Sequence, residues 1–306
     1  MIVFINRRHV SGPWGGGNRT IKTLHETLVK RGHTPCYDLS TNIDIIYCHD
    51  PRPDNAGIRY ENLLWLKQNF NIPIFQRVGD VFYHRGDEYT KYLKSSLQYS
   101  DCVSFITNWA ANFLDIKPDN EKYFVHELKP PKEFFQNKRE TKNKKIRLIT
   151  HHWSTNPLKG FDFYLEIDKM LSRYSNVEFI YLGRKPANFN PKNIKLLDVK
   201  DVIGVKAELY KSDIYVTASK YETGGNHVVE ALASKLPILY HGLGGGICDI
   251  SKNYGTCYNN IEEFETNMLE IIQNITNKKN LIFSGSLEDM CNVYCNLMEK
   301  LHKEKL

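Results

Sequence analysis

Short apolar runs alternate along the whole chain with polar segments that contain glycine, proline or asparagine. The runs are typical of buried strands, and they occupy residues 2–6, 44–48, 73–76, 102–107, 123–127, 146–150, 177–182, 194–199, 214–218 and 237–240. Helical spacing of apolar residues lies between or after them, at about residues 19–31, 87–99, 261–274 and 287–303. This alternation predicts α/β domains with parallel sheets.

A polar, charged segment divides the pattern into two halves. Residues 129–145 contain prolines at their start and then the run NKRETKNKK, with no apolar period. A chain of 306 residues also fits about two domains. We therefore expect one Rossmann-like domain over residues 1–140, a second over 141–285, and a C-terminal helix over 286–306.

Composition narrows the class of protein. Seven cysteines, odd in number and scattered, disfavour a disulfide framework. The net charge of +6 fits an anionic small ligand, an acidic acceptor or an anionic membrane surface about equally well. No apolar run approaches the roughly 20 residues of a membrane span, and the start, MIVFINRRH, does not resemble a signal peptide. We expect a cytoplasmic protein, with peripheral membrane contact left open. We expect no nucleic-acid partner, because the basic run lacks interleaved aromatic residues.

The most informative stretch is residues 221–240, YETGGNHVVEALASKLPILY, which predicts a turn, a short helix and a strand. Glu222 and Glu230 flank a glycine pair that lets the backbone turn sharply and approach a ligand. Asn226 is the expected N-cap of the helix. Free N–H groups beside two carboxylates suit a ligand that carries both hydroxyls and negative charge, such as a nucleotide sugar. The alternative is a capped helix with solvent-facing carboxylates and no function.

The whole pattern resembles the retaining glycosyltransferases of family 4. It comprises Glu222, a glycine turn, Glu230 eight residues later, an alanine-containing helix and Pro237 before a strand. The family usually has Gly-x-Pro at the last position, whereas Lys235 and Leu236 precede the proline here. The resemblance implies the GT-B fold: two Rossmann-like domains whose parallel sheets face an interdomain cleft, with a last helix that often crosses back to the first domain.

The resemblance also implies how donor and acceptor are divided. The second domain would hold a nucleoside-diphosphate sugar, and the first would hold a glycan, a lipid-linked glycan or another hydroxyl acceptor. Donor contacts are expected at turns and helix starts, namely Gly15, Gly16, Gly17, Lys159, Gly183, Arg184, Val202, Gly224, Gly225, Asn226, His227 and Glu230. Glu230 would hold the ribose hydroxyls. The family has an arginine about five residues before Lys159, and whether His151, His152 or Ser154 replaces it stays open.

Three further candidates follow strand ends in the first half. His49 and Asp50 come after the run at 44–48, and Asp80 comes after the run at 73–76, where open α/β sheets bind ligands. Ordinary turns are the alternative. By resemblance these residues would lie with Glu222 near the reacting sugar and acceptor. Arg52 and Arg59 are expected either to hold an anionic acceptor or to be solvated.

The sequence therefore predicts a retaining glycosyltransferase that moves a sugar from a nucleoside-diphosphate sugar to a hydroxyl. No Asp-x-Asp cluster is evident, so we expect no metal and no cofactor besides the donor. The alternative is a non-catalytic nucleotide-sugar or sugar-binding protein of the same fold. A nicotinamide-dependent oxidoreductase is disfavoured, because the run Gly15–Gly17 lacks the Gly-x-Gly-x-x-Gly spacing.

Overall fold

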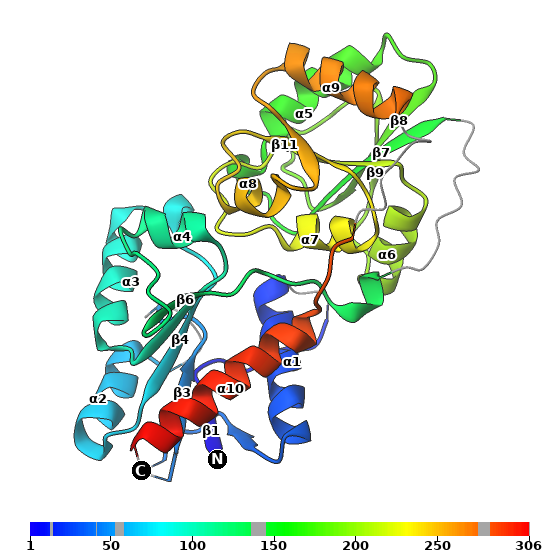
Figure 1. Ribbon diagram of the computed structural model, residues 1–306. Coiled ribbons are helices and arrows are strands. Elements are labelled where there is room, and N and C mark those ends of the chain that lie inside the picture. Colours follow the sequence, from blue (N-terminus) through cyan, green and yellow to red (C-terminus); the bar gives the residue numbers. More distant parts are fainter. Residues whose placement is uncertain (13–14, 41, 53–57, 136–144, 275–281, 306) are drawn as a thin grey trace. The chain divides into compact units, whose positions relative to one another are not determined.

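The computed structural model describes residues 1–12, 15–40, 42–52, 58–135, 145–274 and 282–305. Most of the polar segment at 129–145 therefore lies outside the described residues. The chain divides into two compact units, Met1–Lys129 with Ser286–Leu306, and Pro130–Gly285. Each unit is built on one six-stranded sheet with helices packed against it (Figure 1).

The sheet of the first unit is parallel throughout, in the order β2-β1-β3-β4-β5-β6. Every residue of the interior strands β3, β4 and β5 is buried, which explains why these strands are mostly apolar. Gln76, Arg77 and Ser104 are buried polar exceptions. The strands are β1 (Ile2–Ile5), β2 (Thr34–Cys36), β3 (Ile45–Cys48), β4 (Ile74–Val78), β5 (Cys102–Phe105) and β6 (Tyr123–Val125).

The last helix of the chain completes the first unit. It packs against the first helix and the sheet, and the two helices lie side by side in Figure 1 (red and blue). Its buried residues Met290, Tyr294 and Met298 share a core with Val3 and Leu24. The helices of this unit are α1 (Gly16–Lys30), α2 (Tyr60–Phe70), α3 (Asp87–Tyr99), α4 (Asn108–Phe113) and α10 (Leu287–Lys305), with a 3-10 turn η1 (Tyr83–Arg85).

The second unit repeats the plan with the strand order β12-β11-β10-β7-β8-β9, again all parallel. Its strands are β7 (Ile146–His152), β8 (Val177–Gly183), β9 (Ile194–Leu197), β10 (Ile214–Thr217), β11 (Ile238–His241) and β12 (Gly255–Tyr258). Its helices are α5 (Phe161–Leu171), α6 (Val202–Tyr210), α7 (Asn226–Ala233), α8 (Gly246–Ser251) and α9 (Ile261–Gln273), with 3-10 turns η2 (Lys132–Phe134) and η3 (Pro157–Lys159).

The prediction of parallel α/β sheets is confirmed, and the differences are local. The apolar pattern missed β2 and β12, which are edge strands with few buried residues and hence no apolar run. It also missed α2, because Trp65 and Phe70 are exposed and blur the helical period. Among the described helices, none is both long and apolar enough to cross a membrane.

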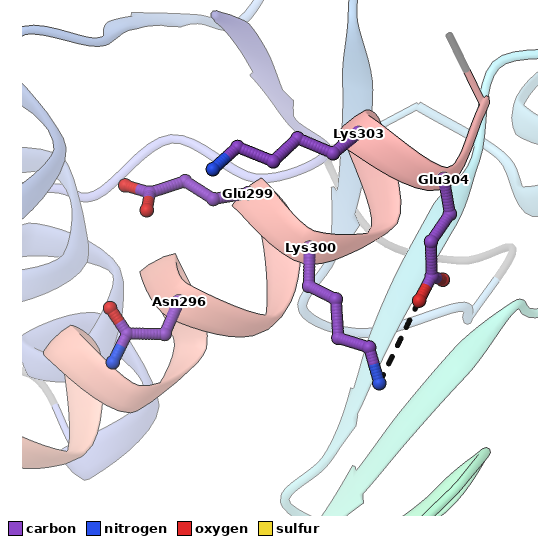
Figure 2. Close-up of a pocket in the computed structure, with 5 residues that line it drawn as sticks. All are labelled: Asn296, Glu299, Lys300, Lys303 and Glu304. Atoms are coloured by element: carbon purple, nitrogen blue, oxygen red, sulfur yellow. Dashed lines mark ion pairs between the residues drawn. The ribbon is translucent and has the colours of Figure 1, made fainter.

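A surface hollow on α10 contains none of the predicted site residues. It is lined by Asn296, Glu299, Lys300, Lys303 and Glu304 (Figure 2). The Lys300 ammonium lies 3.7 Å from the Glu304 carboxylate. The Glu299 carboxylate contacts Arg31 and His33, which lie at and just after the end of α1. The polar face of α10 is thus held against the end of α1.

Candidate functional site

A short ion pair in the second unit joins two predicted site residues. Lys159 Nζ donates a hydrogen bond to Glu222 Oε1 at 2.5 Å, and the two side chains are 18% and 16% exposed. Lys159 follows β7 and Glu222 follows β10, so both stand at the carboxyl edge of the sheet, where α/β folds bind ligands. Burial opposes ionisation of Glu222, but the charge of Lys159 holds its pKa well below the usual range. Glu222 is therefore a carboxylate that only accepts hydrogen bonds.

The backbone after Lys159 explains why a glycine follows it. The turn η3 begins with Asn156, whose side chain accepts a hydrogen bond from Leu158 N. Gly160 then adopts φ +79°, a left-handed conformation that side chains other than glycine rarely adopt. A Cβ at this position would lie 2.2 Å from the carbonyl oxygen of Ala218. Gly160 thus allows the lysine turn to lie directly on the end of β10.

Replacing Gly160 by alanine should lower the free energy of unfolding by about 3 kcal/mol or more. Left-handed backbone costs about 1–2 kcal/mol, and overpacking adds about 1–3 kcal/mol. Gly32→Ala is the matched control, because Gly32 has φ +78° with open space around the added Cβ. Denaturant unfolding of both variants measures the difference. Equal losses would show that the contact with Ala218 is unimportant.

The helix after Glu222 starts one residue earlier than the sequence suggested. The N-cap of α7 is Gly225, and Asn226 is the first helical residue, so the expected Asn226 cap is wrong. No side chain caps this end by a hydrogen bond. A Cβ at Gly225 would lie 3.0 Å from Ile247 and Val228, so the glycine allows close packing against α8. The start of α7, with Gly224 before it, offers backbone N–H groups beside Glu222.

The second glutamate of the pattern has a buried partner. Glu230 Oε2 lies 2.9 Å from His151 Nε2, and the side chains are 2% and 1% exposed. The pair joins α7 to β7 inside the unit. The role of Glu230 toward ribose hydroxyls stays a prediction, because its carboxylate is part of the core in this structure.

His151, His152 and Ser154, the candidates to replace the arginine of family 4, precede Lys159 in the chain. Burial is the largest cause that holds the pKa of His152 well below its usual range. A neutral imidazole supplies no positive charge to a phosphate. Ser154 Oγ accepts a hydrogen bond from Asn156 N and so shapes the turn before Lys159.

Three imidazoles gather below this edge of the sheet, and sequence reasoning did not foresee the cluster. The ring of His227 lies 4.9 Å from that of His152 and 6.0 Å from that of His151, measured between centroids. The hydroxyl of Tyr215 lies 3.2 Å from His151 Nδ1 and 3.0 Å from His227 Nδ1. The adjacent histidines at the end of β7 were the available signal, but Tyr215 could not be selected from the other strand tyrosines.

The remaining donor candidates also stand at the carboxyl edge of the second sheet. Gly183 ends β8 with φ +124°, and a Cβ there would lie 2.0 Å from the carbonyl oxygen of His152. Arg184 N donates to the same oxygen at 3.0 Å. Val202 begins α6, which is capped by the side chain of Asp201. The first two contacts hold the end of β8 against the end of β7, and the Asp201 side chain fixes the start of α6.

In the first unit the structure brings the glycine run to His49. Gly15 is the N-cap of α1, and Gly16 and Gly17 begin the helix. A Cβ at Gly17 would lie 3.1 Å from His49 Nε2, so the imidazole lies against the helix start. Burial, and then the charge of Arg77 and other nearby arginines, hold the pKa of His49 well below its usual range. A neutral histidine therefore stands beside N–H groups that no side chain caps.

The two predicted aspartates of this unit have different environments. Asp50 is buried and forms ion pairs with Arg7, at 2.8 Å, and with Arg52. Arg52 is thus held by Asp50 rather than solvated, whereas Arg59 is exposed. Asp80 accepts a hydrogen bond from Phe82 N at 2.8 Å, and burial raises its pKa. Within the described residues, no group of three or more His, Cys, Asp or Glu side chains is arranged to hold a metal ion.

Two parallel six-stranded sheets with flanking helices define the GT-B fold of glycosyltransferases. Residues 146–274, which include Lys159, Glu222 and Glu230, match the family model described as glycosyl transferases group 1. The match covers less than half of the chain and lies within the second unit. No curated protein matches the chain in sequence.

Solved structures resemble the chain over nearly its whole length. Sucrose-phosphate synthase from Thermosynechococcus elongatus is 13% identical with a TM-score of 0.72, and the match covers 99% of each chain. A glycosyltransferase from Rickettsia africae ESF-5 is 14% identical with a TM-score of 0.64, over 98% of each chain. Anabaena HepE in complex with UDP is 11% identical with a TM-score of 0.64, over 99% of this chain and 97% of that one. At these identities the likeness shows the fold.

Proposed function

We propose that the protein is a retaining, metal-independent glycosyltransferase that moves a sugar from a nucleoside-diphosphate sugar to a hydroxyl acceptor. The observation that carries the proposal is the Lys159–Glu222 pair at the carboxyl edge of the second sheet. It lies inside the matched domain and beside the start of α7, whose N–H groups no side chain caps. A cation, uncapped N–H groups and a carboxylate together suit a ligand with both phosphates and hydroxyls.

Each member of the pair has a distinct task in this reaction. The Lys159 ammonium has three donors, so it keeps Glu222 as a partner while it stabilises negative charge on the departing diphosphate. Glu222 accepts hydrogen bonds from the donor sugar. Lys159 and the backbone N–H groups at the start of α7 supply the positive charge toward the phosphates that a metal ion would otherwise provide.

The bond changes balance without a covalent enzyme intermediate. The acceptor oxygen forms a bond to the anomeric carbon on the face from which the phosphate oxygen leaves. The leaving phosphate oxygen takes the acceptor proton, so the products are a glycoside of retained configuration and a nucleoside diphosphate. In the first unit, the proposed contacts of the acceptor hydroxyl are the neutral imidazole of His49 and the side chain of Asp80. The hydroxyl belongs to a glycan, a glycolipid or a similar molecule.

A ligand screen tests the proposed function. UDP, GDP and ADP, each alone and as sugar nucleotides, are added to the purified protein while its thermal unfolding is recorded. One nucleotide family should stabilise the protein, by about 2.7 kcal/mol at 100 times its Kd. UDP is the first choice, because a structure with the same fold was solved with UDP. No stabilisation by any nucleotide would refute the proposal.

Turnover separates the enzyme from a non-catalytic binding protein of the same fold. The stabilising sugar nucleotide is incubated with the wild-type protein and with Glu222→Gln, and release of nucleoside diphosphate is measured with and without candidate acceptors. The wild type should release nucleoside diphosphate, and the variant should bind the nucleotide but release far less. A protein that binds but releases none, even at high concentration, would be a binding module.

A further inference from the structure

A chain of polar contacts links the two glutamates of the second unit. It runs from Glu230 Oε2 to His151 Nε2, at 2.9 Å, and from His151 Nδ1 to the Tyr215 hydroxyl, at 3.2 Å. It continues from this hydroxyl to His227 Nδ1, at 3.0 Å, and ends where His227 Nε2 lies 3.5 Å from Glu222 Oε1. The interior members are buried, so the proton positions along the chain are set by the protein groups themselves.

When each of the two imidazoles carries a single proton, the number of protons fixes the direction of these hydrogen bonds. A carboxylate only accepts, so a neutral His151 must carry its proton on Nε2, facing Glu230. The Nδ1 atom of His151 then carries no proton and accepts the hydrogen bond that the Tyr215 hydroxyl donates. The Tyr215 oxygen also receives the backbone N–H of His151 at 3.2 Å. The Tyr215 oxygen must therefore accept a hydrogen bond from His227, so the proton of His227 lies on Nδ1.

The consequence is a bare nitrogen beside Glu222. His227 Nε2 is buried and has no hydrogen-bond partner among the described residues. Its distance of 3.5 Å from Glu222 Oε1 exceeds that of an ordinary hydrogen bond, as expected for two acceptors. Burial lowers the pKa of His227, which agrees with a neutral ring. A buried acceptor without a donor costs about 1–3 kcal/mol, and such a group calls for an explanation.

We propose that His227 Nε2 accepts a hydrogen bond from a hydroxyl of the donor sugar, beside Glu222, and that Tyr215 and His151 are positioning residues that keep this nitrogen free of a proton. The inference rests on the proposed function. The group that binds here is a neutral hydroxyl rather than a phosphate oxygen, because a bare imidazole nitrogen and a carboxylate both repel an anion. Lys159, which donates to the same Glu222 oxygen, is left for the phosphates.

The proton position is testable without any ligand. In protein labelled with ¹⁵N in its histidine rings, long-range ¹H–¹⁵N NMR spectra report which ring nitrogen is protonated, and His227→Gln assigns the signals. At neutral pH, His227 should be protonated on Nδ1 and bare on Nε2. A proton on Nε2 in the wild-type protein would overturn the inference.

Two tyrosine variants separate positioning from general packing. Tyr215→Phe removes the hydroxyl that orders the chain, so the His227 signals should move toward a mixture of both tautomers. Tyr164→Phe is the matched control, because Tyr164 bonds His152 at 2.9 Å and is equally buried. It should leave the His227 signals in place. Identical His227 signals in Tyr215→Phe and wild type would overturn the positioning role, and the wild-type spectrum decides the tautomer even if this variant fails to fold.

Binding measurements test the sugar hydroxyl. The probes are the sugar nucleotide that stabilises the wild type and its nucleoside diphosphate alone. His227→Asn retains a polar atom near Nδ1 but none near Nε2, whereas His227→Gln places an amide oxygen near Nε2. The asparagine variant should bind the sugar nucleotide about 10-fold more weakly, which corresponds to one hydrogen bond of about 1.4 kcal/mol. It should bind the nucleoside diphosphate as the wild type does, and glutamine should restore most of the loss.

Other outcomes distinguish the two levels of the proposal. Equal losses for both probes, or a glutamine variant no better than asparagine, would overturn the role of His227 Nε2. A wild-type protein that binds no nucleotide would refute the proposed function and the sugar hydroxyl with it. The ring-nitrogen spectra would still decide whether Tyr215 fixes the tautomer.

Discussion

Lys159→Met is expected to lower the rate of sugar transfer by about 10²–10³-fold, the usual effect of removing one group that stabilises charge in a transition state. Methionine has nearly the length of lysine, so the packing of the η3 turn is retained while the ammonium is lost. The loss should appear mainly in kcat, because charge on the leaving diphosphate develops as the bond breaks. Steady-state rates with the donor found by the ligand screen measure it.

Lys220→Met is the matched control for this experiment. Lys220 lies two residues before Glu222 and forms an ion pair with Asp162, whose side chain is 70% exposed, at 3.4 Å. Exposed pairs of this kind are worth about 0–1 kcal/mol, so the control should retain nearly the wild-type rate. If both lysine variants lose the same activity, general positive charge at this edge of the sheet is important rather than the contact between Lys159 and Glu222.

His151→Leu is expected to lower the free energy of unfolding by about 3–5 kcal/mol, the usual cost of leaving a buried charge without the group that pairs with it. Leucine fills a similar volume, so the loss comes from the Glu230 carboxylate, which stays 2% exposed and loses its histidine. Equilibrium denaturant unfolding at pH 7 measures the change.

The double variant His151→Leu, Glu230→Leu should recover much of this stability, because apolar residues can replace a buried pair at little cost. Lys300→Leu is a control on an exposed pair, and it should change stability by less than about 1 kcal/mol. A small effect of His151→Leu would mean that water reaches Glu230. In that case Glu230 is accessible, as its predicted role toward ribose hydroxyls requires.

The positions of most strands were predictable from the sequence because parallel strands covered on both faces must be apolar along their length. β10 ends shortly before residues 221–240, and β11 begins within them. Because both strands are buried and apolar, the sequence could be interpreted as a strand, a turn, a helix and a second strand. The edge strands β2 and β12 escaped this reasoning, because a strand with few buried residues has no apolar run to detect.

The contact of Lys159 with Glu222 was predictable only in part. Both residues were selected from short motifs that resemble those of family 4, but their hydrogen bond joins positions 63 residues apart. The contact exists because β7 and β10 are neighbours in the sheet order. Periodicity places residues on strands, whereas the order of strands in the sheet is a property of the whole unit.

The sequence by itself determined the α/β class, the glycine-dependent turns and the identity of Lys159 and Glu222, because each depends on residues close together in the chain. Only the tertiary structure decided that Glu230 pairs with His151 across 79 residues, that Tyr215 lies between two imidazoles and that Asp50 holds two arginines. The physical reason is that burial and proton sharing depend on which side chains the packed elements bring within about 3 Å of one another, and no local pattern encodes that distance.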